Sequence, residues 1–238
     1  HVLASLIPNC MSYDPALQFE LAVIMQDGLR RMVENQEDVF YYITIMNENY
    51  AHPEMPKGVE KDILKGMYLL KAGEKGKNPR VRLLGAGTIF QEVMHAAELL
   101  KNDWNVDSDL YSCPSFTELA RDFHECERQA LFNPEKPAPE SFVSKMLNDS
   151  ETPIIVSTDY VRMYAEQIRP AIKAPYRVLG TDGFGRSDTR PQLRKFFEVD
   201  RYYVTIAALK ELADAGTIEK SVVTCLLYTS PSPRDRSL

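Results

Sequence analysis

The sequence lacks the features that mark several common protein classes. No run approaches the ~20 apolar residues of a membrane-spanning helix, and the longest candidate, Val39 to Met46, has the length of a strand. The first residues include no initiating Met and no signal-peptide pattern, so we interpret the chain as one entered midway. We therefore expect no membrane partner.

Cysteine is also scarce, and the acidic residues outnumber the basic ones, 34 to 28. The four cysteines are far apart and form no CxxC pair, which argues against a zinc site or a disulfide framework and favours a reducing cytoplasm. Cys10 and Cys113 lie in apolar segments, and we expect both to be small core residues. The formal net charge of -6 leaves no excess of Lys and Arg to replace counterions, so no nucleic-acid partner is expected.

The usual short motifs of catalysis and binding are missing as well. The four histidines lie in no nucleophile signature, and His95 and His124 fall within helix patterns, where we expect surface or packing roles. Gly85-Ala86-Gly87 invites comparison with a dinucleotide-binding motif, but Phe90 stands where that motif has its third glycine. No recognised spacing of metal ligands occurs, so no metal site is predicted.

What the chain does contain is an alternation of strand and helix patterns. This predicts an α/β fold with a mostly parallel sheet covered by helices. Strands are expected at residues 6–10, 39–46, 67–70, 81–84, 109–113, 153–157 and 176–180. The third and fourth of these flank a loop rich in Gly and Lys, which predicts an antiparallel hairpin at the sheet edge.

Helix patterns fill most of the gaps between these strands. Asp14 followed by Pro15 predicts a helix start, and the apolar residues after it at helical spacing are expected to face the core. These residues are Leu17, Leu21, Met25, Leu29 and Met32. Ser115 and Glu118 have the spacing of a capping box, and the last long helix is expected to start near Asp200.

Two polar segments at strand exits are candidates for a functional site. The apolar run 39–46 predicts a central strand buried on both faces, whose tip, residues 47–50, would lie where open α/β sheets bind ligands. A capped turn is the alternative for this tip. The loop 181–188 contains two glycines, an arginine and two aspartates, and we favour a turn or interface loop whose Asp188 caps the next helix over a ligand-binding loop.

Composition also predicts two boundaries. A loop with two prolines at residues 52–58 is expected to divide the chain into residues 1–56 and residues 57–224. The tail, residues 225–238, has a composition unlike the rest, and one choice of codons for most of it spells a sequencing adapter. We therefore interpret the tail as non-native and expect it not to continue the helix that begins near Val223.

Five segments carry a resemblance to a known family. They are IPNCMSYDPALQFELAVIMQDGLRRM, YYITIMNENYAHPEMPKGVEKDILKGMY, SFTELARD, STDYVRMYAEQIRP and YRVLGTDGFGRSDTRPQLRKFFEVD. Almost word for word, they resemble the carboxyl-terminal part of the homodimeric bacterial pyruvate dehydrogenases, which are transketolase-like. The resemblance implies that residues 1–56 end the pyrimidine-binding domain for thiamine diphosphate. Residues 57–224 would then form a transketolase-like carboxyl-terminal domain in three layers with a mostly parallel sheet.

The resemblance also implies the activity of the parent protein. Enzymes of this family decarboxylate pyruvate on thiamine diphosphate, held with Mg²⁺, and acetylate the lipoyl group of the dihydrolipoamide acetyltransferase component. The GDG motif for the metal and the activating Glu cannot be placed in this chain, and Thr181-Asp182-Gly183 is not that motif. We therefore expect the fragment alone to be inactive and to bind the cofactor weakly. The resemblance also implies a second copy of the protein as its partner, in a homodimer.

Residue by residue, the resemblance nominates four positions. His1 is similar to the last His of a family histidine cluster, and His1 and Glu48 are the catalytic candidates. Asn47 and Asn49 would line the active-site mouth, although Glu48 could equally be an ordinary ion-pair partner. No residue is assigned to the cofactor or to a metal. The alternatives are a non-catalytic dimerisation or scaffold module, or a related 2-oxo acid dehydrogenase or transketolase-type enzyme.

Overall fold

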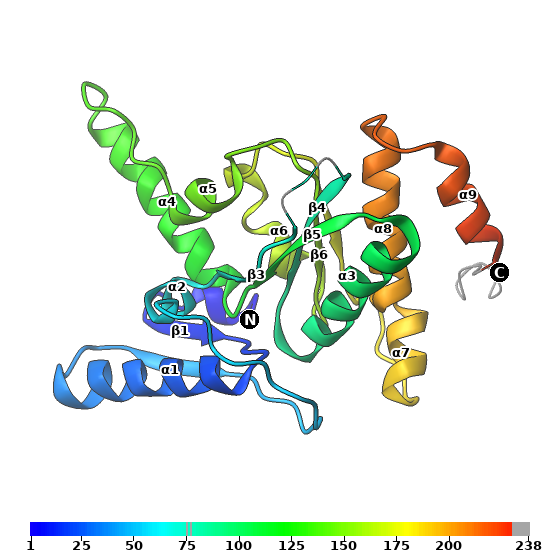
Figure 1. The fold of residues 1–238 in the computed structure, drawn as a ribbon. Helices are drawn as coiled ribbons and strands as arrows, with labels where there is room; N and C mark the ends of the chain where they lie inside the picture. Colours follow the sequence, from blue (N-terminus) through cyan, green and yellow to red (C-terminus); the bar gives the residue numbers. More distant parts are fainter. Residues whose placement is uncertain (75, 77, 230–238) are drawn as a thin grey trace.

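The computed structural model describes residues 1–74, 76 and 78–229, which form two sheets surrounded by helices (Figure 1). The strands are β1 (Cys10–Tyr13), β2 (Phe40–Ile43), β3 (Tyr68–Lys71), β4 (Arg80–Gly85), β5 (Asp107–Ser112), β6 (Ile154–Ser157) and β7 (Tyr176–Leu179). The α-helices are α1 (Gln18–Leu29), α2 (Glu60–Lys65), α3 (Phe90–Trp104), α4 (Phe116–Phe132), α5 (Phe142–Leu147), α6 (Met163–Glu166), α7 (Arg190–Phe196), α8 (Arg201–Asp214) and α9 (Lys220–Thr229). Shorter turns are η1 (Ala4–Leu6), η3 (Gly87–Ile89) and η4 (Arg169–Ala171), and η2 (Arg30–Glu34) continues α1 as a π-helix.

The larger sheet has five strands in the order β3-β5-β4-β6-β7. Neighbours from β5 to β7 are parallel, and β3, at one edge, runs antiparallel to β5. This confirms the predicted α/β sheet, which is mostly parallel. The predicted hairpin is wrong, because β3 pairs its Tyr68 with Ser112 of β5: the chain returns through α3 and places β5 between β3 and β4.

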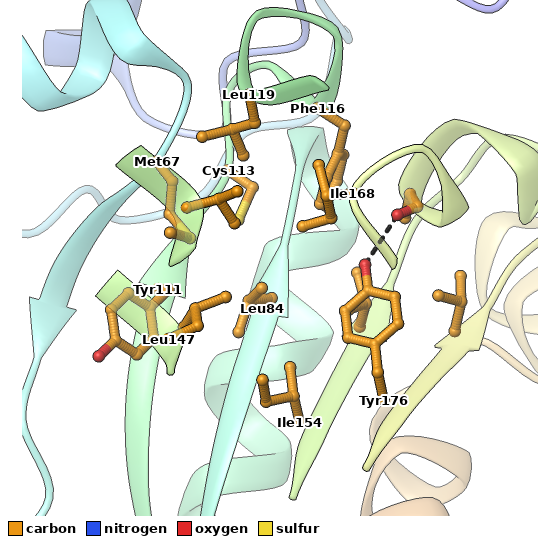
Figure 2. Packing of buried hydrophobic residues seen from close by; sticks show 14 of the residues in the cluster. Met67, Leu84, Tyr111, Cys113, Phe116, Leu119, Leu147, Ile154, Ile168 and Tyr176 are labelled. Atoms are coloured by element: carbon orange, nitrogen blue, oxygen red, sulfur yellow. Dashed lines mark hydrogen bonds between the residues drawn. The ribbon is translucent and has the colours of Figure 1, made fainter. Parts of the chain in front are cut away.

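Helices cover both faces of this sheet and make the predicted three layers (Figure 1). Helices α3 and α8 pack together on one face, and α4, α5 and α6 lie on the other. Adjacent residues of β4 serve the two faces: Leu83 belongs to the cluster beneath α3 and α8, and Leu84 to the cluster with Phe116 and Ile168 in Figure 2. Because each fully buried leucine stabilises a fold by roughly 1.5–3 kcal/mol, this alternation anchors both helical layers to β4.

The smaller sheet consists of β1 and β2, which are parallel. The predicted strand at 6–10 is wrong, since residues 4–6 form a 3-10 turn and the strand begins at Cys10. The predicted buried strand at 39–46 is also wrong: the strand is shorter, and Phe40 and Tyr42 are each 43% exposed. Among the described residues β2 pairs with β1 alone, so its apolar run lies at an edge.

Helix α1 begins later than predicted and buries a different face. Its first turn is capped by the Glu20 carboxylate, which accepts hydrogen bonds from the backbone N–H groups of Ala16 and Leu17. Met25 and Leu29, predicted to be core, are 52% and 57% exposed. The buried face instead carries Glu20 and Ile24, because polar partners in the larger sheet hold Glu20 inside.

Other helix starts follow the sequence more closely. Ser115 caps α4 by accepting a hydrogen bond from the Glu118 N–H at 3.0 Å, as predicted. The return bond of a capping box is replaced, since the Ser115 N–H donates to the carbonyl oxygen of Gly66. Helix α8 starts at Arg201, close to Asp200 as predicted, and Asp200 caps it by accepting from two N–H groups of its first turn.

The helix near the carboxyl end runs farther than expected. Helix α9 extends through Cys225 to Thr229, so the prediction that the tail would not continue this helix is wrong for residues 225–229. Val223 is buried against the α3 and α8 cluster and Leu226 packs beside it, which supports the helix beyond Cys225. The remainder of the predicted tail, residues 230–238, lies outside the described residues, and its non-native origin stays a prediction.

Candidate functional site

The carboxyl ends of strands from both sheets meet at one seam. Asp14 follows β1, Thr44 follows β2, Gly87 follows β4 and Asp159 follows β6. Gly87 donates its N–H to the Asp14 carbonyl oxygen at 2.9 Å, and the Thr44 hydroxyl donates to the Asp14 carboxylate at 2.7 Å. The Thr88 hydroxyl donates to Asp159 at 3.3 Å. We call these strand ends the seam, since here residues 1–56 contact residues 57–224.

Asp14 is the buried centre of the seam and not the helix cap that its spacing predicted. Its side chain is enclosed, and burial raises the pKa of its carboxyl to about 7, against the opposing effect of the hydrogen bond from Thr44. Gly87 has a φ of +54°, and a Cβ added there would come within 2.8 Å of the Asp14 carboxyl carbon. The prediction missed Asp14 as a site residue because its partners lie 30 or more positions away.

His1 lies against the seam, but both of its ring nitrogens are already engaged. Nδ1 lies 2.5 Å from the Ser12 hydroxyl, and Nε2 lies 2.8 Å from the Thr44 hydroxyl. When Asp14 is ionised, Thr44 donates its proton to Asp14, so that His1 donates from Nε2 and accepts from Ser12 at Nδ1. The ring also stacks on Tyr164. The protonation state of Asp14 is thus linked to the tautomer of His1.

The strand tip predicted as a site contacts α7. Glu48 forms an ion pair with Arg194 at 2.6 Å and lies 3.8 Å from Arg190, which also bonds to Asn47. Arg194 reaches Glu92 of α3 on its far side, at 3.4 Å. The tip is therefore connected to α7 by charge-assisted bonds.

Burial acts on these groups in different ways. The two arginines that flank Glu92, Arg194 and Arg201, hold its pKa below the usual range despite its burial. Asp159 is the opposite case, because burial raises its pKa and Arg194 offsets only part of that effect. Asn49, the remaining predicted mouth residue, is exposed. Sequence reasoning missed the arginines of α7, whose spacing of four residues was the available signal.

The loop 181–188 is a surface loop. Its Phe184 is 95% exposed, and Asp182 pairs with Arg162 at 2.5 Å. Asp188 accepts a hydrogen bond from the N–H of Thr189, which is itself the N-cap position of α7. The predicted capping role of Asp188 is therefore wrong by one residue, because Thr189 occupies the cap.

The remaining histidines and the two cysteines of the apolar segments have structural positions. The side chains of His95 and His124 are 43% and 64% exposed, which confirms their surface positions. Cys10 and Cys113 are buried, as predicted, and burial raises the pKa of the Cys113 thiol well above its usual value. None of the helices in the described part of the chain combines the length and apolar character needed to span a bilayer.

The residues present do not fit thiamine diphosphate or Mg²⁺. A diphosphate needs backbone N–H groups or cations at an open glycine turn, and Mg²⁺ needs converging carboxylates. The glycine turn after β4 is filled by the carboxylate of Asp14, whose charge would oppose an anion. Within residues 1–74, 76 and 78–229, no group of three or more His, Cys, Asp or Glu could hold a metal ion.

Two family models match the chain. The model of the pyruvate dehydrogenase E1 component middle domain matches residues 1–53, and that of the transketolase-like TK C-terminal domain matches residues 66–200. The predicted boundary between residues 56 and 57 lies in the unmatched interval and stays a prediction. The second model alone covers more than half of the chain.

Curated relatives are similar along most of the chain. The pyruvate dehydrogenase E1 component of Cupriavidus necator is 63% identical over 224 residues, which is 94% of this chain and 25% of the relative. The components of Pseudomonas aeruginosa and Escherichia coli are 54% and 53% identical, with the same coverage. The chain thus spans about a quarter of the length of the curated relatives that it matches.

Solved structures share the fold at low sequence identity. A transketolase from Pichia stipitis has a TM-score of 0.62 and 17% identity, covering 90% of this chain and 26% of its own. One from Campylobacter jejuni has a TM-score of 0.59 and 16% identity, covering 88% and 27%. With the predicted fold class confirmed in this way, the chain belongs to the transketolase-like TK C-terminal domain family, and over 94% of its length it is similar in sequence to pyruvate dehydrogenase E1 components.

Proposed function

We propose that this chain is the carboxyl-terminal quarter of a thiamine-diphosphate- and Mg²⁺-dependent pyruvate dehydrogenase E1 enzyme of the cytoplasm. The intact enzyme would decarboxylate pyruvate and reductively acetylate the lipoyl group of a dihydrolipoamide acetyltransferase component. One observation carries the proposal: identity of 63% to such a component extends over both matched regions and the seam between them. An unrelated scaffold would not need to retain this whole sequence.

Within that enzyme the chain would complete and brace the cofactor site without holding the cofactor. Thiamine diphosphate supplies the carbanion and the electron sink for decarboxylation when bound. Residues of this chain would position the strand ends: Asp14 holds Thr44, and Thr44 orients His1 at the site mouth. Glu48, with Asn47 beside it, would fix that mouth against α7 through Arg194. Asn49 is exposed at the same tip.

A direct experiment uses the full-length gene from the same source. We expect an upstream GDG motif followed by Asn, a homodimer in sedimentation, and pyruvate-dependent acetylation of a lipoyl domain that requires thiamine diphosphate and Mg²⁺. A full-length enzyme without that motif, or one that prefers another 2-oxo acid or a ketose phosphate over pyruvate, would overturn the assignment.

The isolated chain separates the enzyme fragment from the scaffold alternative in a second way. Thiamine diphosphate titrated into the 238-residue chain by calorimetry should give no saturable heat, since the residues present do not fit its diphosphate. Tight binding would contradict the proposed division of the site. A scaffold role would gain support only if the full-length protein also failed to decarboxylate pyruvate.

A further inference from the structure

A pocket of about 350 Å³ lies beside the seam, between α7, the loop 181–188 and the end of β6. Three arginines line it at intervals of four residues: Arg186, Arg190 and Arg194. Its apolar lining comes from Met46, Leu193, Phe197 and Val199. The volume falls in the range of small-molecule sites, which usually combine an apolar wall with a few converging polar groups.

The three arginines differ in how far their charge is already neutralised. Arg194 is held between two carboxylates, Glu48 at 2.6 Å and Glu92 at 3.4 Å. Arg190 bonds to the neutral Asn47 and lies at the longer distance of 3.8 Å from Glu48. Arg186, the third arginine, is exposed. The charge of Arg194 is thus neutralised by carboxylates, and that of Arg190 is neutralised less.

Arg186 is the cation at the open end of the pocket. Its guanidinium lies 3.9 Å from the centre of the Phe196 ring, so the ring holds one face of the fork and leaves its N–H edge available. In the part of the chain that the structure describes, no carboxylate lies within ion-pair distance of Arg186. Among the described residues, Arg186 is therefore a cation at the rim of the pocket without a carboxylate in ion-pair contact.

Another wall of the pocket contains an acid and a phenol. Asp159 and Tyr160 line the pocket. The carboxylate of Asp159 accepts a long hydrogen bond, 3.3 Å, from the hydroxyl of Thr88. Tyr160 also packs edge-on to the ring of His1, at 4.7 Å between ring centres. An anion seated between the arginines and this wall would face a phenol and one carboxyl group.

We propose that this pocket binds a small organic carboxylate, with its carboxylate on Arg186 and Arg190 and its short carbon chain against the apolar lining. Planar guanidinium groups match a carboxylate with two parallel hydrogen bonds. The apolar side formed by Met46, Leu193 and Phe197 favours an attached alkyl group over a bare inorganic anion. The inference concerns binding to this chain and does not depend on the activity of the whole protein.

Asp159 should couple this binding to pH. The groups that face it are Arg194 from α7, which favours its ionised form, and Glu48, Glu92 and Asp14, which oppose it. A bound carboxylate adds another negative charge nearby and favours the protonated acid further. Binding should therefore tighten as the pH falls, and replacing Asp159 by a neutral residue should weaken that dependence, leaving the part that comes from Asp14.

The test is an NMR titration of the 238-residue chain with propionate, following the side-chain Nε–Hε signals of the arginines. We expect saturable shifts of Arg186 and Arg190, and Arg186→Gln should weaken binding by about tenfold. The matched control is Arg128→Gln, because Arg128 also lies over an aromatic ring, that of Phe132 in α4, far from the pocket in sequence. This control should leave the affinity unchanged.

A gain in affinity provides the second arm. Asp159→Asn should bind propionate more tightly than the wild type at pH 7.5, an effect that a merely damaged fold would not produce. Absence of saturable shifts, equal losses in the Arg186 and Arg128 variants, or an unchanged affinity in Asp159→Asn would each overturn the proposal. Inorganic phosphate that shifts the same signals at the same concentration would overturn the assignment to carboxylates.

Discussion

The carboxylate of Glu20 accepts a hydrogen bond of 2.6 Å from the hydroxyl of Ser112, 92 residues farther along the chain. The same carboxylate accepts from the Tyr68 hydroxyl at 2.6 Å and from two backbone N–H groups at the start of α1. Four donors thus converge on one fully enclosed acid. Glu20 locks the first helix of the chain onto β3 and β5 of the larger sheet.

Replacing Glu20 should show how much this lock contributes to stability. Glu20→Ala leaves the hydroxyls of Tyr68 and Ser112 and the two N–H groups without an acceptor, and each unsatisfied buried donor costs about 1–3 kcal/mol. We expect a loss of at least roughly 3 kcal/mol in the free energy of unfolding, measured by urea denaturation. The control is Glu127→Ala on α4, whose side chain is 58% exposed, and which should change stability little.

The contacts of Glu20 also show why the sequence did not predict the buried face of α1. The capping role and the buried face of α1 were mispredicted because Met25 and Leu29 satisfy the helical period as well as the true inner face does. What decides between the faces is Glu20, and its partners Tyr68 and Ser112 belong to strands that local spacing cannot pair with α1.

Elements whose burial depends on their own sequence were predicted well. β6 and β7 are short apolar runs in the middle of helical patterns, and the structure places them within one residue of expectation. The burial predicted for β2 is wrong, because an apolar run indicates that a strand suits an apolar environment but not that a neighbouring element covers it. Phe40 is therefore left partly exposed. The seam was only half visible, since Asp14 acquires its role from Thr44 and Gly87.

Asp14 should make stability depend on pH. Its pKa in the folded chain, about 7, exceeds the ordinary value of 3.8, so folding favours the protonated acid. This contribution is fully present below about pH 4 and is lost as the pH rises through 7, with a total of roughly 4 kcal/mol. Asp14→Asn should therefore match the wild type near about pH 3, below the unfolded pKa, and be more stable at about pH 8, as judged from urea midpoints. A wild-type advantage at pH 8 would contradict the assignment.

Gly87 provides a steric test of the same seam. Gly87→Ala forces a Cβ to within 2.8 Å of the Asp14 carboxyl carbon and places alanine at a φ of +54°. Gly183 is the matched control, because its φ is +96° but no atom lies within 4 Å of an added Cβ. Backbone strain alone costs roughly 1–2 kcal/mol. Thermal unfolding should show a clearly larger loss of stability for Gly87→Ala than for Gly183→Ala. Equal losses would mean that the Asp14 side chain moves aside without an energetic cost.

Glu48 offers the sharpest test of the predicted site, because its ion pair with Arg194 connects the strand tip to α7. Arg194→Met removes the partner of Glu48 at 2.6 Å, whereas Glu92 keeps Arg201 at 2.8 Å. Because the Glu48 side chain is 24% exposed, the loss should stay below the about 3–5 kcal/mol of a fully buried ion pair. Glu48→Gln should cost less, since Arg194 keeps Glu92 and a neutral acceptor. A double-mutant cycle in urea should therefore give a favourable coupling between Glu48 and Arg194.

In the full-length enzyme, if Glu48→Gln abolishes turnover while the free energy of unfolding barely changes, then Glu48 acts on substrate and the ion pair is incidental. If activity and stability fall together and a restored pair recovers both, then Glu48 acts by holding the site mouth in place.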